Sequence, residues 1–395
     1  MPQTRRIAFV CPRFAEGGAV GGAETLLRNL AARAAGAGLS VTFLTTCARN
    51  HFTWRNDRPA GVEERDGMRV VFFPVDTDRN VEAFQSVQAA ISRGRRVSRE
   101  DQELWLDNSV NSRELYQHLR RHGEDYDLVI TGPYLFGLTR AAALIHPART
   151  LIVPCLHDEP FAYLDVFREL LAEVRGVVFN SEPERDFGLR LYALDPPRTA
   201  VVGMGLDDFE ADGEGFRSRR GLTAPYVMYS GRREPLKGTP LLLDYLAAFR
   251  SRRGRDVKLV LTGSGPFEAP AELVPHVIDL GFVSEREKHD AMAGAAVFCN
   301  PSVNESLGIV ILEAWLAGTC ALVHGAGAVL AHQCRKSNGG LWFRNYPEFE
   351  QCLERLLDEP GLASALSARG RQYVLREYSW ERIEDRFFEA LAKLA

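Results

Sequence analysis

The stretch from Phe298 to Val323 holds the residues whose types and spacing best suit chemistry. It reads FCNPSVNESLGIVILEAWLAGTCALV, and its two acids, Glu305 and Glu313, are eight positions apart. Eight positions are a little over two helical turns, so both acids can face one side. The expected helix runs from about Leu307 to Ala317, and Gly308 stands at its start, where free N–H groups and the helix dipole attract anions. Because carboxylates accept hydrogen bonds from hydroxyls, the stretch indicates a site for a nucleotide-sugar.

A solvated helix face is the alternative interpretation of this acid pair. Glu313, however, is surrounded in sequence by Ile311, Leu312, Ala314 and Trp315. A carboxylate among apolar side chains needs a partner or carries a large desolvation cost.

A cationic loop, Gly231 to Gly238, follows an expected strand over Tyr226 to Ser230. Arg232 and Lys237 stand near its two ends, where a guanidinium and an ammonium can bind a diphosphate and stabilise it as it leaves. The alternative is a surface turn with two solvated cations, since cationic loops are common.

These two stretches resemble motifs of one family. PSxxESLGxxxLEAxxAG and GRxxxxKG are similar to elements of the retaining glycosyltransferases of family 4 (group 1), which have the GT-B fold. The resemblance implies that Arg232 and Lys237 contact the donor pyrophosphate. It also implies that Glu305 touches the donor sugar and that Glu313 holds the ribose.

The resemblance implies further donor contacts in glycine-rich and loop segments. Gly21 and Gly22 begin a GGxE element, and a GxGP loop follows the expected strand Val257 to Leu261. Leu280 to Val283 is similar to the segment near the base. The donor-binding set that follows is Gly21, Gly22, Gly231, Gly263, Gly265, Phe282, Val283, Ser306, Leu307, Gly308 and Glu313.

His157 lies just past an expected strand over Thr150 to Pro154, where ligands bind in open α/β sheets. A histidine is often only a structural hydrogen-bonding group. The family has a similar histidine facing the donor sugar, which implies a catalytic role for His157 and makes Asp158 a secondary candidate.

Asp76-Thr77-Asp78 follows an expected strand over Met68 to Val75. A D-x-D triplet holds a divalent metal in the other large glycosyltransferase fold, GT-A. Aspartate is also common in turns, and the rest of the chain fits GT-B. We therefore expect a turn here, no catalytic metal and no cofactor.

Strands and helices alternate along the chain and restart at Tyr226, which indicates two α/β units with a cleft between them. The resemblance implies two Rossmann-like domains, at 1–205 for the acceptor and 206–378 for the nucleotide-sugar. A C-terminal helix, 379–395, is expected to cross back to the first domain. Residues 79–125 are polar, helical and rich in arginine, which suits exposed helices, an acceptor-binding lobe or contact with anionic lipid headgroups.

Composition and cysteine spacing argue against a nucleic-acid-binding protein, a zinc-cluster protein and a membrane-spanning protein. The net charge of −4 offers no basic field for nucleic acid. Seven scattered cysteines form no C-x-x-C pair and suit a reduced, cytoplasmic protein without a zinc cluster. No apolar run approaches 18 residues, and Ile7 to Val10 is too short for a signal sequence. Peripheral contact with the cytoplasmic membrane stays open.

The predicted function is transfer of a sugar from a UDP- or GDP-sugar to a hydroxyl of a glycan or lipid-linked acceptor, with retention of configuration. Family habit suggests bacterial polysaccharide assembly. Alternatives are a nucleotide-sugar epimerase of the same fold and a non-catalytic nucleotide-sugar-binding protein. A phosphorylase is less favoured, because no motif points to a lysine that would hold pyridoxal phosphate.

Overall fold

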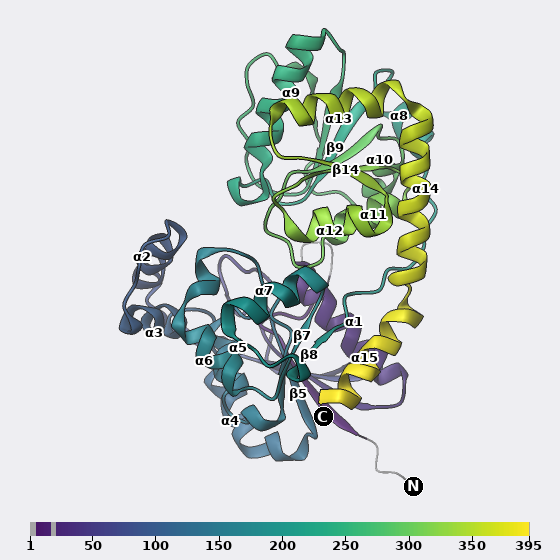
Figure 1. Cartoon of the computed structure of the whole chain (residues 1–395). Coiled ribbons are helices and arrows are strands. Elements are labelled where there is room, and N and C mark those ends of the chain that lie inside the picture. Colours follow the sequence, from purple (N-terminus) through teal and green to yellow (C-terminus); the bar gives the residue numbers. More distant parts are fainter. Residues whose placement is uncertain (1–4, 17–20, 395) are drawn as a thin grey trace. The chain divides into compact units, whose positions relative to one another are not determined.

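The computed structural model describes residues 5–16 and 21–394 and divides the chain into two compact units. Unit 1 comprises residues 1–204 and 384–395, and unit 2 comprises residues 205–383. The last helix, α15 (Trp380–Leu394), begins in unit 2 and continues into unit 1 (Figure 1).

Unit 1 is built on an eight-stranded sheet in the order β3-β4-β2-β1-β5-β6-β7-β8. All neighbours are parallel except β3 and β4. The chain runs outward from β1 through β2 and then outward on the other side from β5, so the strand order reverses between β1 and β5. The strands are β1 (Arg6–Val10), β2 (Ser40–Thr46), β3 (Gly61–Arg65), β4 (Met68–Phe73), β5 (Leu128–Thr131), β6 (Thr150–Ile152), β7 (Gly176–Phe179) and β8 (Thr199–Val201).

The helices of unit 1 bury leucine and aromatic faces against this sheet and against one another. In α1, Leu26, Leu27 and Leu30 recur at helical spacing and are buried, as the sequence predicts. The α2–α3 pair contacts α6 and the turn before it (Figure 1). The helices are α1 (Gly22–Gly36), α2 (Val81–Ser92), α3 (Arg99–Asp107), α4 (Arg113–His122), α5 (Gly137–Ala143), α6 (Asp165–Glu173) and α7 (Glu182–Tyr192).

Unit 2 has a six-stranded, fully parallel sheet in the order β11-β10-β9-β12-β13-β14. Its strand order reverses between β9 and β12. The strands are β9 (Tyr226–Ser230), β10 (Lys258–Thr262), β11 (Val277–Asp279), β12 (Val297–Asn300), β13 (Ala321–His324) and β14 (Gly340–Phe343). The helices are α8 (Gly213–Arg219), α9 (Thr239–Arg253), α10 (Glu285–Ala293), α11 (Ile309–Leu316), α12 (Ala328–Ser337), α13 (Tyr346–Asp358) and α14 (Pro360–Glu377).

Short 3-10 helices supplement the two sheets, and among the described residues no helix is both long and apolar enough to span a bilayer. The 3-10 helices are η1 (Gly123–Asp125), η2 (Pro147–Arg149), η3 (Pro160–Tyr163), η4 (Pro196–Arg198), η5 (Pro235–Lys237) and η6 (Val274–His276). The predicted α/β class with two Rossmann-like parallel sheets is confirmed.

Several predicted boundaries were wrong. The strand expected over Met68 to Val75 ends at Phe73. β11 ends at Asp279, so the segment similar to the one near the base, Leu280 to Val283, lies in a loop. The helix expected from Leu307 begins at Ile309, because Gly308 has a left-handed backbone (φ 79°).

The D-x-D acids lie in the connection after β4, where the sequence predicts a turn. The Asp76 carboxylate accepts hydrogen bonds from the Arg113 amide at 3.2 Å. Asp78 forms an ion pair of 2.7 Å with the Arg113 guanidinium. Arg113 therefore compensates both carboxylates.

Candidate active site

The loops after β9 and β12 meet at the point where the strand order of unit 2 reverses. Lys237, at the end of η5, donates from Nζ to the Glu305 carboxylate at 2.8 Å and to the Asn304 carbonyl at 3.0 Å. Both charged side chains are less than one fifth exposed. Ligands of open α/β sheets bind outside the carboxyl ends of the strands at such a reversal. Two predicted catalytic residues, 68 positions apart in sequence, are thus brought together there.

Glycines allow the neighbouring loops to approach closely. Gly263 has φ 111°, and a Cβ added to it would lie 2.1 Å from the Gly231 carbonyl oxygen. Gly265 has φ 106°, and a Cβ there would lie 2.9 Å from the Arg233 carbonyl oxygen. Since side chains cannot occupy these positions, the loops after β9 and β10 form a closely packed backbone layer.

Arg233 holds this layer together, and the sequence analysis missed it. Its buried guanidinium donates to the carbonyls of Gly263 (3.0 Å) and Gly265 (3.1 Å) and to the Asp279 carboxylate (2.8 Å). The predicted residue next to it, Arg232, is 56% exposed and lies 3.3 Å from Glu234. The sequence signal was only a pair of adjacent arginines, which does not show which one is buried.

The start of α11 lies at the same edge of the sheet. A Cβ on Gly308 would lie 2.4 Å from Leu330, so this position requires glycine on steric as well as backbone grounds. The first amides of a helix have no partner within it and attract anions. Leu307 has a buried side chain, so it can offer a ligand only backbone groups, while Ser306 is half-buried.

Glu313 lies within α11, with its side chain 12% exposed, and has a partner that the sequence analysis did not identify. Lys288 of α10 donates to Glu313 at 3.0 Å and to Glu285 at 2.7 Å. Burial raises the pKa of the Glu313 carboxyl, and Lys288 partly offsets that effect. Burial opposes the charge of Lys288, but Glu313 and Glu285 outweigh it and raise the pKa of the ammonium.

His289 completes a group that has the chemistry of a metal site. Its ring nitrogen and carboxylate oxygens of Glu285 and Glu313 all lie within 4.8 Å of one another. Burial, followed by the charge of Lys288, lowers the pKa of His289 to about 4, so the imidazole is neutral. Lys288 already forms ion pairs with both carboxylates, so a divalent cation at this group would compete with its ammonium. The expectation that no metal is needed stays a prediction.

The predicted base-binding residues lie in the loop between β11 and α10. Phe282 exposes 58% of its surface, which leaves an aromatic face open beside this edge of the sheet. Val283 is half-buried next to it and precedes Ser284, the cap of α10.

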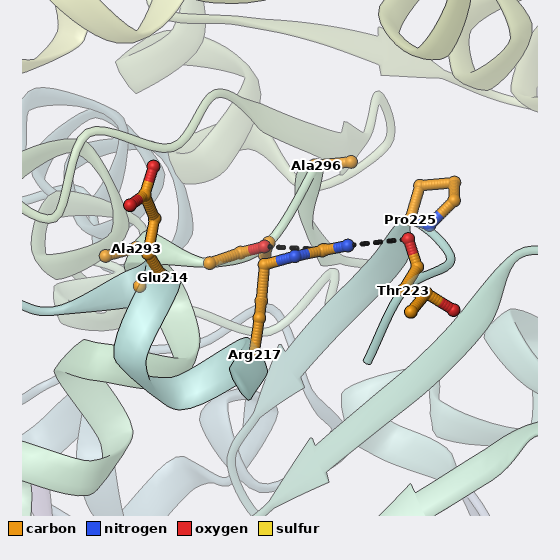
Figure 2. A pocket seen from close by; sticks show the side chains of 9 residues that line it. Glu214, Arg217, Thr223, Pro225, Ala293 and Ala296 are labelled. Carbon is orange, nitrogen blue, oxygen red and sulfur yellow. Dashed lines mark hydrogen bonds between the residues drawn. The ribbon is translucent and has the colours of Figure 1, made fainter. Parts of the chain in front are cut away.

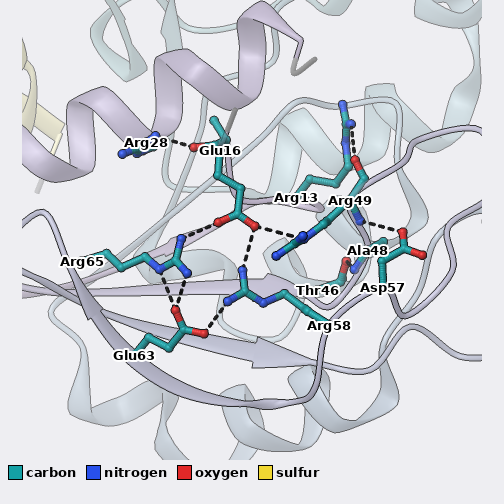
Figure 3. Close-up of polar contacts among 11 residues, drawn as sticks. Arg13, Glu16, Arg28, Thr46, Ala48, Arg49, Asp57, Arg58, Glu63 and Arg65 are labelled. Atoms are coloured by element: carbon teal, nitrogen blue, oxygen red, sulfur yellow. Dashed lines mark hydrogen bonds and ion pairs between the residues drawn. The ribbon is translucent and has the colours of Figure 1, made fainter. Parts of the chain in front are cut away.

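In unit 1, the loop after β1 is held at both of its described ends. Gly21 and Gly22 are exposed at the start of α1, and the buried Glu24 accepts two hydrogen bonds from Arg13, the longer at 3.1 Å. At the other end, Glu16 pairs with Arg58 at 3.0 Å and with Arg65 and Arg49 (Figure 3). Gly17 to Val20 of the predicted glycine-rich loop lie outside the described residues.

His157 follows β6 by five positions and is partly exposed, with Nδ1 3.6 Å from the Glu159 carboxylate. Glu159 is buried and accepts a hydrogen bond of 3.1 Å from the Tyr134 hydroxyl. The buried Glu184 accepts from the amides of Leu156 (2.5 Å) and Asn180 (2.6 Å). Two buried acids therefore fix the loop that carries His157.

A separate pocket of about 350 Å³ in unit 2 lies at the opposite edge of the sheet (Figure 2). It is lined by residues just before β9 and β12, among them Pro225 and Ala296. Arg217 donates there to the carbonyls of Thr223 (2.9 Å), Ala224 and Gly294. Since its guanidinium is used by backbone carbonyls, this pocket is a structural feature away from the candidate site.

Comparisons with known proteins agree with this geometry. The family described as "Glycosyltransferase Family 4" matches residues 20–208, and that described as "Glycosyl transferases group 1" matches residues 224–359. A D-inositol 3-phosphate glycosyltransferase of Salinispora tropica is 29% identical over 68% of this chain and 65% of its own length. The one of Actinosynnema mirum is 30% identical over 62% of this chain and 66% of its own. The aligned part of the chain thus spans just under two thirds of these relatives.

Solved structures show the same fold. Sucrose-phosphate synthase of Thermosynechococcus elongatus has a TM-score of 0.73 at 19% identity, covering 99% of both chains. Anabaena HepE, solved with UDP and glucose, has a TM-score of 0.70 at 17% identity and covers 98% of this chain and 99% of its own. WaaG, a glycosyltransferase involved in lipopolysaccharide biosynthesis, has a TM-score of 0.66 at 18% identity, covering 97% of this chain and 99% of its own. These neighbours show the GT-B fold, and the two family matches, which together cover most of the chain, show that it belongs to the group 1 type of glycosyltransferase family 4.

Proposed function

We propose that this chain is a retaining glycosyltransferase that moves a sugar from a nucleoside-diphosphate donor to a hydroxyl of a glycan or lipid-linked acceptor. The observation that carries the proposal is the hydrogen-bonded pair of Lys237 and Glu305 at the strand-order reversal of unit 2. It places a cation suited to a diphosphate and an acid suited to sugar hydroxyls beside the start of α11.

In the proposed reaction the acceptor hydroxyl attacks the anomeric carbon from the side on which the diphosphate leaves. The bond from that carbon to the phosphate oxygen breaks, the bond to the acceptor oxygen forms, and the acceptor proton goes to a phosphate oxygen. Lys237 and the exposed Arg232 hold the developing charge, with amides near Gly308. Glu305 and His157 orient the sugar, and Glu313 accepts from the ribose hydroxyls.

The ligands and roles of similar solved structures support a particular donor and a particular pathway. HepE is solved with UDP-glucose and the Escherichia coli trehalose-6-phosphate protein with UDP-2-fluoro glucose, which supports a UDP-sugar donor here. WaaG is involved in lipopolysaccharide biosynthesis, which supports a role in bacterial polysaccharide assembly here. We propose that the protein works in the cytoplasm, at the inner face of the membrane. We expect no cofactor and no metal requirement, because cationic side chains and amides can bind the diphosphate.

The test is a proton NMR time course with UDP-glucose, UDP-galactose and GDP-mannose, run with and without a mixture of sugar acceptors. An axial product linkage from an axial donor would support retention, and loss of turnover in Glu305→Gln would support the site. An inverted linkage would refute the retaining mechanism. Conversion of the donor to its epimer without any acceptor would refute the transferase and favour the epimerase.

A further inference from the structure

A pocket of about 530 Å³ lies in unit 1 next to the loop that carries His157. One wall is the turn after α2 and includes Arg95 and Arg96, and the other runs from Asp158 to Asp165. Its volume is in the range of pockets for small polar ligands. Asp158 directly follows His157, so the pocket begins where the sequence predicts contact with the donor sugar.

Both walls are fixed by packing. Trp105 of α3 stacks on Phe161 of η3 with ring centroids 5.3 Å apart and contacts Phe167 of α6 edge-on. Gln102, which is 3% exposed, accepts a hydrogen bond of 3.2 Å from the Val166 amide. The α2–α3 pair therefore packs against η3 and α6, the helices that follow β6 (Figure 1).

The two arginines of the first wall differ from Arg99, which has carboxylate partners. Arg99, at the start of α3, forms ion pairs with Glu103 (2.7 Å) and Glu169 (2.6 Å). Arg95 and Arg96 are exposed, and among residues 5–16 and 21–394 no hydrogen bond or ion pair involves either guanidinium. Their backbone is nevertheless ordered, since the Arg95 amide donates to the Ala90 carbonyl at 3.1 Å. Two unpaired cations thus face a pocket from a fixed turn.

The second wall offers groups that suit a sugar. The Asp158 carboxylate accepts from the Tyr163 hydroxyl at 2.8 Å and retains further acceptor capacity. Tyr163 is 54% exposed, so its ring can pack against the apolar face of a pyranose. Asp165 is exposed at the start of α6. Guanidinium groups on one side and hydroxyl acceptors on the other select a ligand that carries both phosphate and hydroxyl groups.

We propose that this pocket binds the acceptor through a phosphate or diphosphate ester on its sugar, with Arg95 and Arg96 holding the ester and Asp158 the hydroxyls. This inference rests on the proposed transferase function and names the acceptor class for it. A free sugar phosphate and a lipid-linked sugar diphosphate share this chemistry.

The test is direct calorimetric titration of the full chain with glucose 6-phosphate, geranyl diphosphate and glucose. The variant is Arg95→Ala/Arg96→Ala, and the matched control is Arg93→Ala. Arg93 is exposed in the same turn but does not line the pocket. Circular dichroism of each variant checks folding, and UDP binding to the wild type is measured separately.

We expect a phosphorylated probe to bind the wild type, with the dissociation constant raised about tenfold or more in the double variant, as for lost hydrogen bonds to charged groups. Arg93→Ala should leave it within about twofold. Tighter binding of glucose 6-phosphate would assign a free sugar phosphate, and tighter binding of geranyl diphosphate a lipid-linked acceptor. Any of three results would overturn the proposal. The wild type and the double variant bind the phosphorylated probe equally well, Arg93→Ala weakens binding as much as the double variant does, or glucose binds as tightly as glucose 6-phosphate. If UDP does not bind the wild type, the transferase function is contradicted, while the binding of the phosphorylated probe at Arg95 and Arg96 still stands.

Discussion

At the scale of single residues, the candidate site consists of charges that compensate one another. Lys237 pairs with Glu305, and Lys288 pairs with Glu313, each at 3.0 Å or less. Such pairing compensates partly buried charges without a ligand. A nucleotide-sugar offers phosphate to the cation and hydroxyls to the acids, so it can replace or extend these bonds at small desolvation cost.

Substituting Lys237 by alanine should lower turnover by about 10² to 10³, because one donor to the developing diphosphate charge is lost. Arg232→Ala should act in the same direction. Arg369→Ala is the control, since Arg369 is exposed on α14. Steady-state kinetics, with thermal melts to verify folding, would measure this. Near-normal turnover in both Lys237→Ala and Arg232→Ala would remove them from the site.

Substituting Lys288 by methionine should make nucleotide binding depend on pH. Burial raises the pKa of Glu313, and Lys288 is the cation that opposes this, while Glu285 adds to the rise. Without Lys288 the pKa of Glu313 rises further. As the pH falls, the Glu313 carboxylate of the variant is therefore protonated at a higher pH than that of the wild type, and the proposed acceptor for the ribose hydroxyls is lost. Titrations of UDP between pH 5 and 8 should show weaker binding of this variant at the acid end, and Lys288→Arg should restore it. A pH profile parallel to that of the wild type would show that Lys288 does not keep Glu313 ionised.

At the scale of elements, the site depends on loops that follow adjacent strands. Strand type and order follow from apolar runs such as those of β9 and β12, which the sequence shows directly. The loops depend on contacts between distant segments, such as Gly263 against Gly231 and Arg233 against Asp279.

Substituting Gly263 by alanine should destabilise the protein by about 1–3 kcal/mol, because its φ of 111° and the Gly231 carbonyl exclude a Cβ. That corresponds to a fall in melting temperature of roughly 2 to 12 °C for a unit of this size. Gly361→Ala is the matched control: Gly361 lies in α14 with open space around it, so alanine should be neutral or stabilising. Equal melting temperatures for both variants would contradict the close approach of the two loops.

Substituting Glu184 by glutamine should reduce the dependence of stability on pH. Burial raises the pKa of Glu184 from its usual 4.5 to about 8. The folded state therefore binds a proton that the unfolded state releases between about pH 4.5 and 8, so the stabilising contribution is lost as the pH rises through this range. Melting temperatures from pH 5 to 8.5 should fall less in the variant than in the wild type. An identical decline in both proteins would show that Glu184 does not titrate in this range.

The sequence predicted the two sheets and most helices, because apolar periodicity is a local signal. Its short motifs supplied the candidate site residues, and the structure brings two of them, Lys237 and Glu305, together. The sequence analysis missed Arg233 and Lys288, whose roles depend on partners 46 and 25 positions away. The helix predicted from Leu307 begins two residues later, at Ile309, because apolar periodicity does not reveal the left-handed backbone of Gly308. The roles of all the predicted site residues stay predictions.

At the scale of the whole molecule, each unit carries one part of the predicted chemistry. Unit 2 contains Lys237 and Glu305, paired at its strand-order reversal, together with Arg232 and Glu313. Unit 1 contains His157 and the Arg95–Arg96 pocket. The family matches follow the same division, with one in each half of the chain. The central claim is therefore that unit 2 binds a nucleoside diphosphate.

The most direct test of that claim is a thermal-shift panel with UDP, GDP, ADP and their sugar conjugates, on wild type and Glu313→Ala. A nucleotide at about 100 times its dissociation constant adds roughly 2.7 kcal/mol to the free energy of unfolding, enough to raise the melting temperature by several degrees. The account predicts such a rise with one nucleotide, UDP, and its loss in Glu313→Ala. No rise with any nucleotide, or an equal rise in Glu313→Ala, would contradict the assignment of the donor site.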